Sequence, residues 1–208
     1  MKSKVIITTK KLIAVLLTLL IISSVLPSFT VKTSAAGITA TTPNKDGNGV
    51  YQIGTSAELY WFADKVNNDN ANYGSAKAVL TADIVVNTDV LKADGTLNSG
   101  TFTNWTPIGN YDNKYIGTFD GQGHTISGLY LNNTSTSYVG LFGCLGTDGE
   151  IKNVGVIDSY FRGYSYVGGV CGENNSGTIT GCYNTGTVSS SYNYAGGVCG
   201  VNRNTITG

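Results

Sequence analysis

One short motif occurs three times in the C-terminal half of the chain: YVGLFG at residues 138–143, YVGGVCG at 166–172 and YAGGVCG at 194–200. The matching glycines are 28 residues apart from copy to copy: Gly140, Gly168 and Gly196. A second motif follows each copy, and its last copy comes one residue early: Glu150–Val154, Thr178–Cys182 and Thr205–Gly208. A fixed period of this size is typical of a repeat architecture, in which each repeat is one structural unit.

The repeated blocks have the pattern of short β-strands. Each block is five to seven residues long, and apolar residues alternate with polar ones in Thr178–Thr180 and Thr187–Ser189. This period of two buries one face of a strand. Polar turns rich in Asn and Gly, such as 173–177 and 184–186, separate the blocks. We therefore predict an all-β parallel β-solenoid in which each repeat is one coil, whereas a β-sandwich would not require a constant repeat.

The segment from Tyr138 to Gly208 resembles consecutive GLUG motifs, which are named for the Gly-Leu-x-Gly core found at Gly140–Gly143. The two later copies carry Gly-Gly-Val-Cys at this core. Residues 115–131 are similar to the lead-in that precedes such motifs, so the resemblance covers residues 50–208. The resemblance implies a bacterial secreted or cell-surface protein. It leaves the activity open, because the motif also occurs in IgA-cleaving metallopeptidases.

The sequence predicts four segments. Residues 1–36 have the layout of a signal peptide, with lysines, then the apolar run Leu12–Ile22, then the small residues Ser34–Ala36 before a cleavage point. Residues 37–49 are predicted to be a linker or loose lead-in. Residues 50–114 are predicted to form an N-terminal cap and first rungs, and residues 115–208 the GLUG-like repeats. The chain stops in the middle of a repeat, which suggests a longer polypeptide.

The predicted cap begins with a helix over about 56–67. Thr55 and Glu58 fit a capping box, and apolar residues follow at helical spacing: Leu59, Phe62, Ala63 and Val66. Such a helix would cover the open end of a stack of strands. Further strands are predicted at 78–80, 84–86 and 105–109, with a polar loop at 88–104.

Composition argues against several functional classes. The chain has 13 Lys+Arg and 13 Asp+Glu, and removal of residues 1–36 takes away five lysines and no acid, leaving a net charge of −5. A mildly acidic chain without a basic run does not suit nucleic acid as a partner. The apolar run of the signal peptide is shorter than the roughly 20 residues that span a bilayer. We therefore expect secretion or a cell-surface location, with no membrane span after cleavage.

The four cysteines are Cys144, Cys171, Cys182 and Cys199. The glycine spacing aligns Cys171 with Cys199, and places Cys144 one residue out of register, opposite Gly172. Free, buried thiols are the favoured interpretation because free Cys packs as a small apolar residue. The alternative is a disulfide between Cys171 and Cys199. The sequence has no CxxC pair and one His, so we predict no metal site and no cofactor.

We predict no catalytic residues. His124 lies in a Gly-rich turn without an orienting constellation, and HExxH and GxSxG motifs are absent. The spacing of the acidic residues singles out no pair suited to glycoside chemistry. An enzyme remains the alternative, either a β-helix carbohydrase that uses Asp158 and Arg162, or a metallopeptidase whose catalytic domain lies beyond Gly208.

Tyrosine is the most suggestive residue for binding. Tyr138, Tyr166 and Tyr194 recur at the repeat period and must form a ladder. The ladder is either core stacking or a binding surface for cell-wall glycans, host glycans or surface proteins. From these features we predict a non-catalytic secreted or cell-surface protein that acts as an adhesin or rigid spacer. A glycan-binding module is a further alternative.

Overall fold

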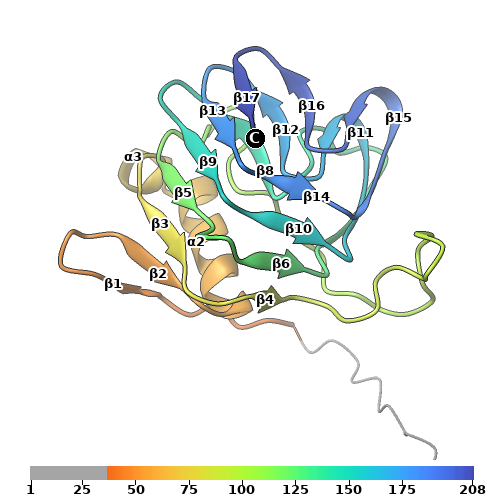
Figure 1. Cartoon of the computed structure of the whole chain (residues 1–208), viewed down its shortest axis with the longest axis horizontal. Helices are drawn as coiled ribbons and strands as arrows, with labels where there is room; N and C mark the ends of the chain where they lie inside the picture. Colours follow the sequence, from red (N-terminus) through yellow and green to blue (C-terminus); the bar gives the residue numbers. More distant parts are fainter. Residues whose placement is uncertain (1–36) are drawn as a thin grey trace, which may run out of the picture. The chain divides into compact units, whose positions relative to one another are not determined.

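The computed structural model describes residues 37–208, so the predicted signal peptide lies outside the described residues. The described part is mostly β (Figure 1). Its helices are α2 (Ser56–Asn68) and α3 (Asn70–Tyr73). Its strands are β1 (Asn44–Lys45), β2 (Tyr51–Ile53), β3 (Ala78–Leu80), β4 (Ile84–Val85), β5 (Thr118–Asp120), β6 (Thr125–Ser127), β7 (Tyr130–Asn132), β8 (Phe142–Leu145), β9 (Glu150–Lys152), β10 (Gly155–Ile157), β11 (Tyr160–Gly168), β12 (Cys171–Asn174), β13 (Thr178–Thr180), β14 (Tyr183–Asn184), β15 (Thr187–Gly196), β16 (Cys199–Asn202) and β17 (Thr205–Thr207).

The strands form four sheets, through which the chain passes in the same order three times. The sheet orders are β1-β2-β3-β5-β9-β13-β17, β14-β10-β6-β4, β15-β11-β7 and β16-β12-β8. We call the successive passages round 1 (β5–β8), round 2 (β9–β12) and round 3 (β13–β16). All pairings between rounds are parallel, and β1 with β2 is the antiparallel pair. Figure 1 shows β5, β9 and β13 side by side in this succession.

The register follows the predicted repeat, with one correction. Glu150 pairs with Thr178, and Thr178 pairs with Thr205 one residue early, as the sequence spacing predicts. However, Cys171 pairs with Phe142 rather than Gly143, so Cys144 faces Glu173. The reason is local: Val139 pairs with Val167 at the repeat spacing, and round 2 then takes one extra residue before Cys171.

The core lies between the sheets and is built from the inward side chains of each short strand. The central residues Phe119, Ile151 and Ile179 are fully buried and lie in one column of the first sheet, because they are register partners. Ile206, the next in this column, is 38% exposed because no further strand covers it within the described residues. Burial in this fold therefore depends on a round on each side.

The helix α2 forms as its sequence predicts. The Thr55 hydroxyl accepts a hydrogen bond from the Glu58 N–H, and the Glu58 carboxylate accepts from the Gly54 N–H at 2.9 Å. The predicted apolar stripe is the buried face. Phe62 packs with ring centroids 6.2 Å from Phe119 and 6.0 Å from Tyr115. The helix thus buries its stripe against the first rounds, near β2 and β3 (Figure 1).

Two segments differ from the sequence prediction. Residues 105–109 form no strand but make a single bridge through Ile108, while Trp105 and Ile108 are buried. Pro107 supplies no backbone N–H for a ladder. The predicted linker 37–49 contains β1, because the Asp46 carboxylate accepts hydrogen bonds from the Asn48 and Val50 N–H groups and closes a turn onto β2.

Candidate functional site

The three repeat tyrosines form the predicted ladder. The ring centroids of Tyr138 and Tyr166 are 4.7 Å apart with planes 11° apart, and those of Tyr166 and Tyr194 are 5.1 Å apart at 40°. Tyr111 extends the ladder, with its ring 5.5 Å from Tyr138. The repeat pattern could not predict Tyr111, because it lies in a turn before the repeats. The structure therefore has a column of four aromatic rings.

The same three tyrosines have a left-handed backbone, with φ of 61° at Tyr138, 56° at Tyr166 and 62° at Tyr194. This conformation is uncommon for residues with a Cβ. It recurs at the same position of each round, two residues before the repeated glycine. The fold therefore sets the ring column by a repeated backbone corner as well as by ring contacts.

Ring stacking determines which part of the column faces solvent. Because the faces of Tyr138 and Tyr166 cover each other, these residues present ring edges and hydroxyls rather than open faces. Tyr194 is 55% exposed. Tyr111, at the other end, is 56% exposed, and Lys114 Nζ lies 4.7 Å from its ring centroid. A sugar that stacks on an aromatic face would find a ring without a neighbouring lysine at the Tyr194 end of the column. Whether the ladder binds a ligand stays a prediction.

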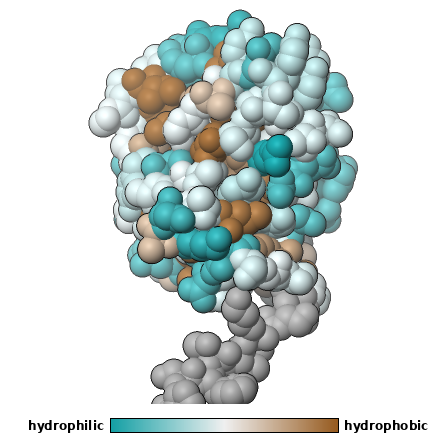
Figure 2. Space-filling model, turned by 90° about the vertical axis from the view of Figure 1, so that its right-hand side faces the viewer, coloured by the Kyte–Doolittle hydropathy of each residue, from teal (hydrophilic) through white to brown (hydrophobic). Residues whose placement is uncertain are grey.

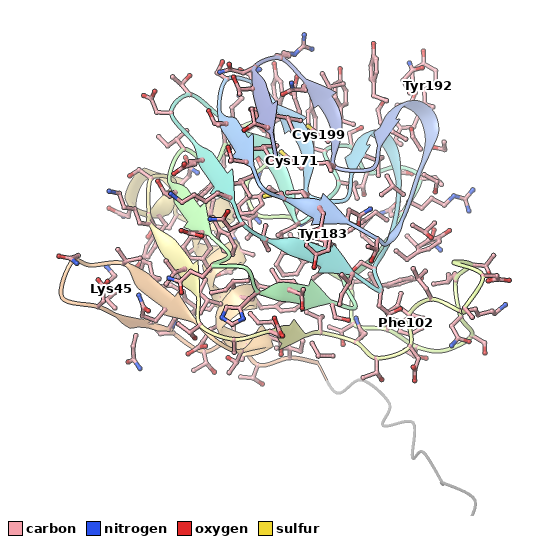
Figure 3. The ribbon with its side chains drawn as sticks, in the orientation of Figure 1. Lys45, Phe102, Cys171, Tyr183, Tyr192 and Cys199 are labelled. Carbon is pink, nitrogen blue, oxygen red and sulfur yellow. The ribbon has the colours of Figure 1, made fainter. Side chains whose placement is uncertain are left out.

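A second pair, Tyr164 and Tyr192, stacks with ring centroids 5.0 Å apart and planes 6° apart. Both rings are exposed, Tyr192 by 65%. Figure 3 shows Tyr192 projecting from the outer turn of β15. The signal for this pair was present in the sequence, because the two tyrosines are separated by the repeat period, but the repeat motif itself does not include them.

An ion pair lies beside the ladder. Arg203 Nε donates to Glu173 Oε1 at 2.7 Å, and the Glu173 side chain is 4% exposed. Burial, with the nearby Glu173 carboxylate as second cause, raises the pKa of Tyr138 to about 12 and that of the Cys144 thiol to about 12. The Tyr138 phenol is therefore neutral at physiological pH and can donate a hydrogen bond. Sequence reasoning did not single out Glu173 or Arg203 as partners.

All four cysteines are free. Cys144 and Cys171 are buried, whereas Cys182 and Cys199 are partly exposed. Cys171 and Cys199 are register partners on neighbouring strands (Figure 3). The proximity that the alternative disulfide requires is therefore present.

The residues considered for catalysis are not brought together. The Asp158 carboxylate accepts hydrogen bonds from the backbone N–H groups of Val90 and Leu91, which hold the loop after β4. Among residues 37–208, no ion pair joins Asp158 to Arg162. His124 Nδ1 lies 3.3 Å from Asp83 Oδ1 in an exposed turn. Asp158 thus has a structural role in the described fold.

Two further kinds of feature concern metal ions and membranes. No cluster of three or more His, Cys, Asp or Glu side chains suited to a metal occurs between residues 37 and 208. Within the same residues, none of the helices has the length and apolar character needed to cross a bilayer. The face in Figure 2 is mainly hydrophilic or neutral, with separate small hydrophobic patches. The ring ladders are therefore the most distinctive surface feature.

Comparisons with known proteins agree with the repeat pattern. The model of the GLUG motif matches residues 163–189, which run from β11 into β15. This match confirms the resemblance for one repeat of the chain. No solved structure matches the chain.

Two relatives are similar in sequence. Halomucin of Haloquadratum walsbyi is 34% identical over 160 residues, which are 74% of this chain and 2% of halomucin. A protein of Evansella cellulosilytica described as a Gly-rich membrane protein is 35% identical over 77 residues, which are 36% of this chain and 9% of that protein. The chain thus corresponds to a small part of each relative.

Proposed function

Because residues 163–189 form a GLUG motif, we propose that the chain is a β-solenoid segment of a surface protein and acts without catalysis as an adhesin or rigid spacer. The observation that carries the proposal is the parallel pairing of equivalent residues in successive rounds, as in Ile151 with Ile179 and Ile179 with Ile206. The strands of each round pair with those of the round before it. Repeated interfaces of this kind give a stiff element whose length grows with the number of repeats.

The names of the relatives support the surface location. One is called a halomucin and the other a membrane protein, and each aligns with this chain over only a small part of its own length. A segment that corresponds to a small part of a much longer chain suits a spacer. Protease treatment of intact cells that produce the full chain tests this location: cleavage within residues 37–208 without lysis is expected, and protection of these residues would contradict it.

The solenoid is tested by adding a round. A second copy of residues 169–196, inserted after Gly196, should lengthen the particle by about 4.8 Å, the spacing of neighbouring strands. It should also raise the free energy of unfolding, because one more interface forms. Small-angle scattering and urea unfolding measure both quantities. The control is a Gly/Ser insert of equal length, which forms a flexible loop. If both inserts behave alike, the solenoid proposal fails.

A glycan-binding function is a second candidate, favoured by the exposed rings of Tyr192 and Tyr194. Aromatic side chains give a rigid contact area that loses little conformational entropy on binding. Binding to a panel of cell-wall glycans should be lost in Tyr192→Ala and Tyr194→Ala. It should be retained in Tyr111→Ala, because the Tyr111 ring, which is also exposed, is already contacted by Lys114 Nζ at 4.7 Å. Equal binding by all three variants would argue for a spacer alone.

A further inference from the structure

Cys171 in β12 and Cys199 in β16 occupy the same position in rounds 2 and 3. They are direct register partners in a parallel sheet. Neighbouring strands are about 4.8 Å apart, which lies within the Cα separations of about 4.4–6.8 Å that disulfides span. Figure 3 shows the two side chains next to each other. The strand pairing therefore places the Cα atoms of Cys171 and Cys199 within the range that a disulfide spans, and side-chain rotation of the two thiols would bring the sulfurs together.

The other two cysteines have different neighbours. Cys144 pairs with Glu173, and its thiol points to the Glu173 carboxylate at 3.9 Å. Cys182 lies between β13 and β14, where its thiol donates to the Thr180 carbonyl oxygen at 3.3 Å. Geometry thus singles out one pair among the four cysteines.

From this geometry we propose that Cys171 and Cys199 are a redox-active dithiol, which a small disulfide such as oxidised glutathione converts into a disulfide between rounds 2 and 3. The structure holds the reduced form. The inference concerns this chain itself and does not depend on a surface location or on an adhesive role.

The two thiols differ in exposure and in pKa, and this difference determines which of them reacts first. Cys199 is partly exposed, and a hydrogen bond from the Cys171 thiol lowers its pKa. Cys171 is fully buried, and burial raises the pKa of its thiol. Because the thiolate is the nucleophile in disulfide exchange, Cys199 attacks first.

The reaction has two balanced steps. The Cys199 thiolate attacks one sulfur of oxidised glutathione, which forms a mixed disulfide on Cys199 and releases one glutathione thiolate. The Cys171 thiol then gives its proton to a base in solution, and its sulfur attacks the Cys199 sulfur. A second glutathione thiolate leaves. Two protein thiols are oxidised, and oxidised glutathione is reduced to two molecules of glutathione.

The disulfide would act on the least covered part of the described chain. In round 3, β14, β15 and β16 each have a partner strand on one side only within the described residues, so Val198 is only partly buried whereas its counterpart Val170 is fully buried. A covalent link to round 2 closes a loop of one repeat and limits the separation of the last round. Oxidation should therefore slow amide hydrogen exchange in β15 and β16, by about tenfold, and leave β5 and β6 unchanged.

Trapping the intermediate tests the proposal. The full chain is incubated with oxidised glutathione and analysed by intact mass and non-reducing peptide mapping. The expected result is loss of two hydrogen atoms and one peptide that links Cys171 to Cys199. In Cys171→Ser, glutathione should remain attached to Cys199, because the second step cannot occur. In Cys199→Ser, Cys171 should carry no glutathione.

A Cys144→Ala/Cys182→Ala variant is the matched control and should form the same link as the unmodified chain. If Cys171→Ser fails to fold, this control and Cys199→Ser still decide the outcome. The proposal is wrong if the control forms no disulfide, if Cys171 becomes linked to Cys144, or if glutathione attaches to Cys171 in place of Cys199.

Discussion

Tyr166 has a ring neighbour on both sides in the ring column, with its centroid 4.7 Å from that of Tyr138 and 5.1 Å from that of Tyr194. Tyr194 has one such neighbour. Aromatic pairs contribute about 0.5–1.5 kcal/mol beyond their buried area. The middle of the column should therefore carry more stability than its end.

We predict that Tyr166→Ala lowers the free energy of unfolding by about 2–3 kcal/mol, and Tyr194→Ala by about 1 kcal/mol. Urea unfolding of the two variants measures the difference. Tyr166→Phe is the control, because it keeps the ring and should stay within about 0.5 kcal/mol of the original chain. Equal losses for the two Ala variants would show that ring stacking does not stabilise the column.

Gly168 lies where the backbone of round 2 is tightly packed. A Cβ at this position would collide with the Cys171 carbonyl oxygen, which belongs to the backbone and cannot rotate away. We predict that Gly168→Ala destabilises the chain by about 3 kcal/mol. Gly47→Ala is the control, because a Cβ there has no neighbour within 4 Å, and its effect should be under about 0.5 kcal/mol. Thermal unfolding distinguishes the two, and a tolerated Gly168→Ala would refute this packing argument.

Alkaline pH should weaken the fold through Tyr138. Burial and the Glu173 carboxylate raise the pKa of this phenol to about 12 from its usual value of 10.0. The folded state holds the proton more tightly than the unfolded state, so this stabilisation is complete below pH 10 and is lost as the pH rises toward 12. In Tyr138→Phe the stability should fall less steeply over this range. Urea midpoints measured across the range test this, and an unchanged slope in Tyr138→Phe contradicts it.

The buried Glu173 carboxylate depends on Arg203 for its charge partner. Arg203→Ala leaves the carboxylate buried without this ion pair, so the variant should unfold at a lower urea concentration. Adding Glu173→Gln to Arg203→Ala removes the unpaired charge and should recover most of the loss. If the double variant is less stable than Arg203→Ala, the carboxylate is stabilised by groups other than Arg203.

Sequence patterns predict well where a residue's position follows from local spacing. Thr55, Glu58 and the apolar stripe identify α2, and the repeat period identifies the partners Ile151 and Ile179. The period could not locate the extra residue before Cys171, because the glycine spacing stays constant while the pairing shifts. Local bulges in a ladder depend on contacts between strands that no single repeat encodes.

The candidate site was predicted only in part, for a similar reason. Tyr138, Tyr166 and Tyr194 follow from the period, but Tyr111 joins them from a turn outside the repeats. The pair of Glu173 and Arg203 joins β12 to the turn after β16, and nothing in the spacing of charges indicates it. The repeat spacing predicts contacts between equivalent residues of successive rounds. It does not predict contacts between non-equivalent residues, because these depend on the three-dimensional packing of the rounds.

The isoleucine column offers a direct measure of stacking, since the same residue type occupies one position in three successive strands. Ile151 and Ile179 are fully buried, and Ile206 is 38% exposed. Ile151→Ala and Ile179→Ala should each cost about 2–5 kcal/mol, the usual loss for a buried isoleucine. Ile206→Ala should cost about 1 kcal/mol or less, because its side chain already contacts water.

Urea unfolding of the three variants provides the comparison, and Thr178→Ala on the outward face of β13 is the matched control with an expected change under about 0.5 kcal/mol. The prediction extends to the chain with a second copy of residues 169–196. There the copied round should leave Ile206 at the end of the column, so that Ile206→Ala still costs little while Ile179→Ala stays costly. A cost for Ile206→Ala that equals the cost for Ile179→Ala would mean that burial in this column does not come from the stacking of rounds.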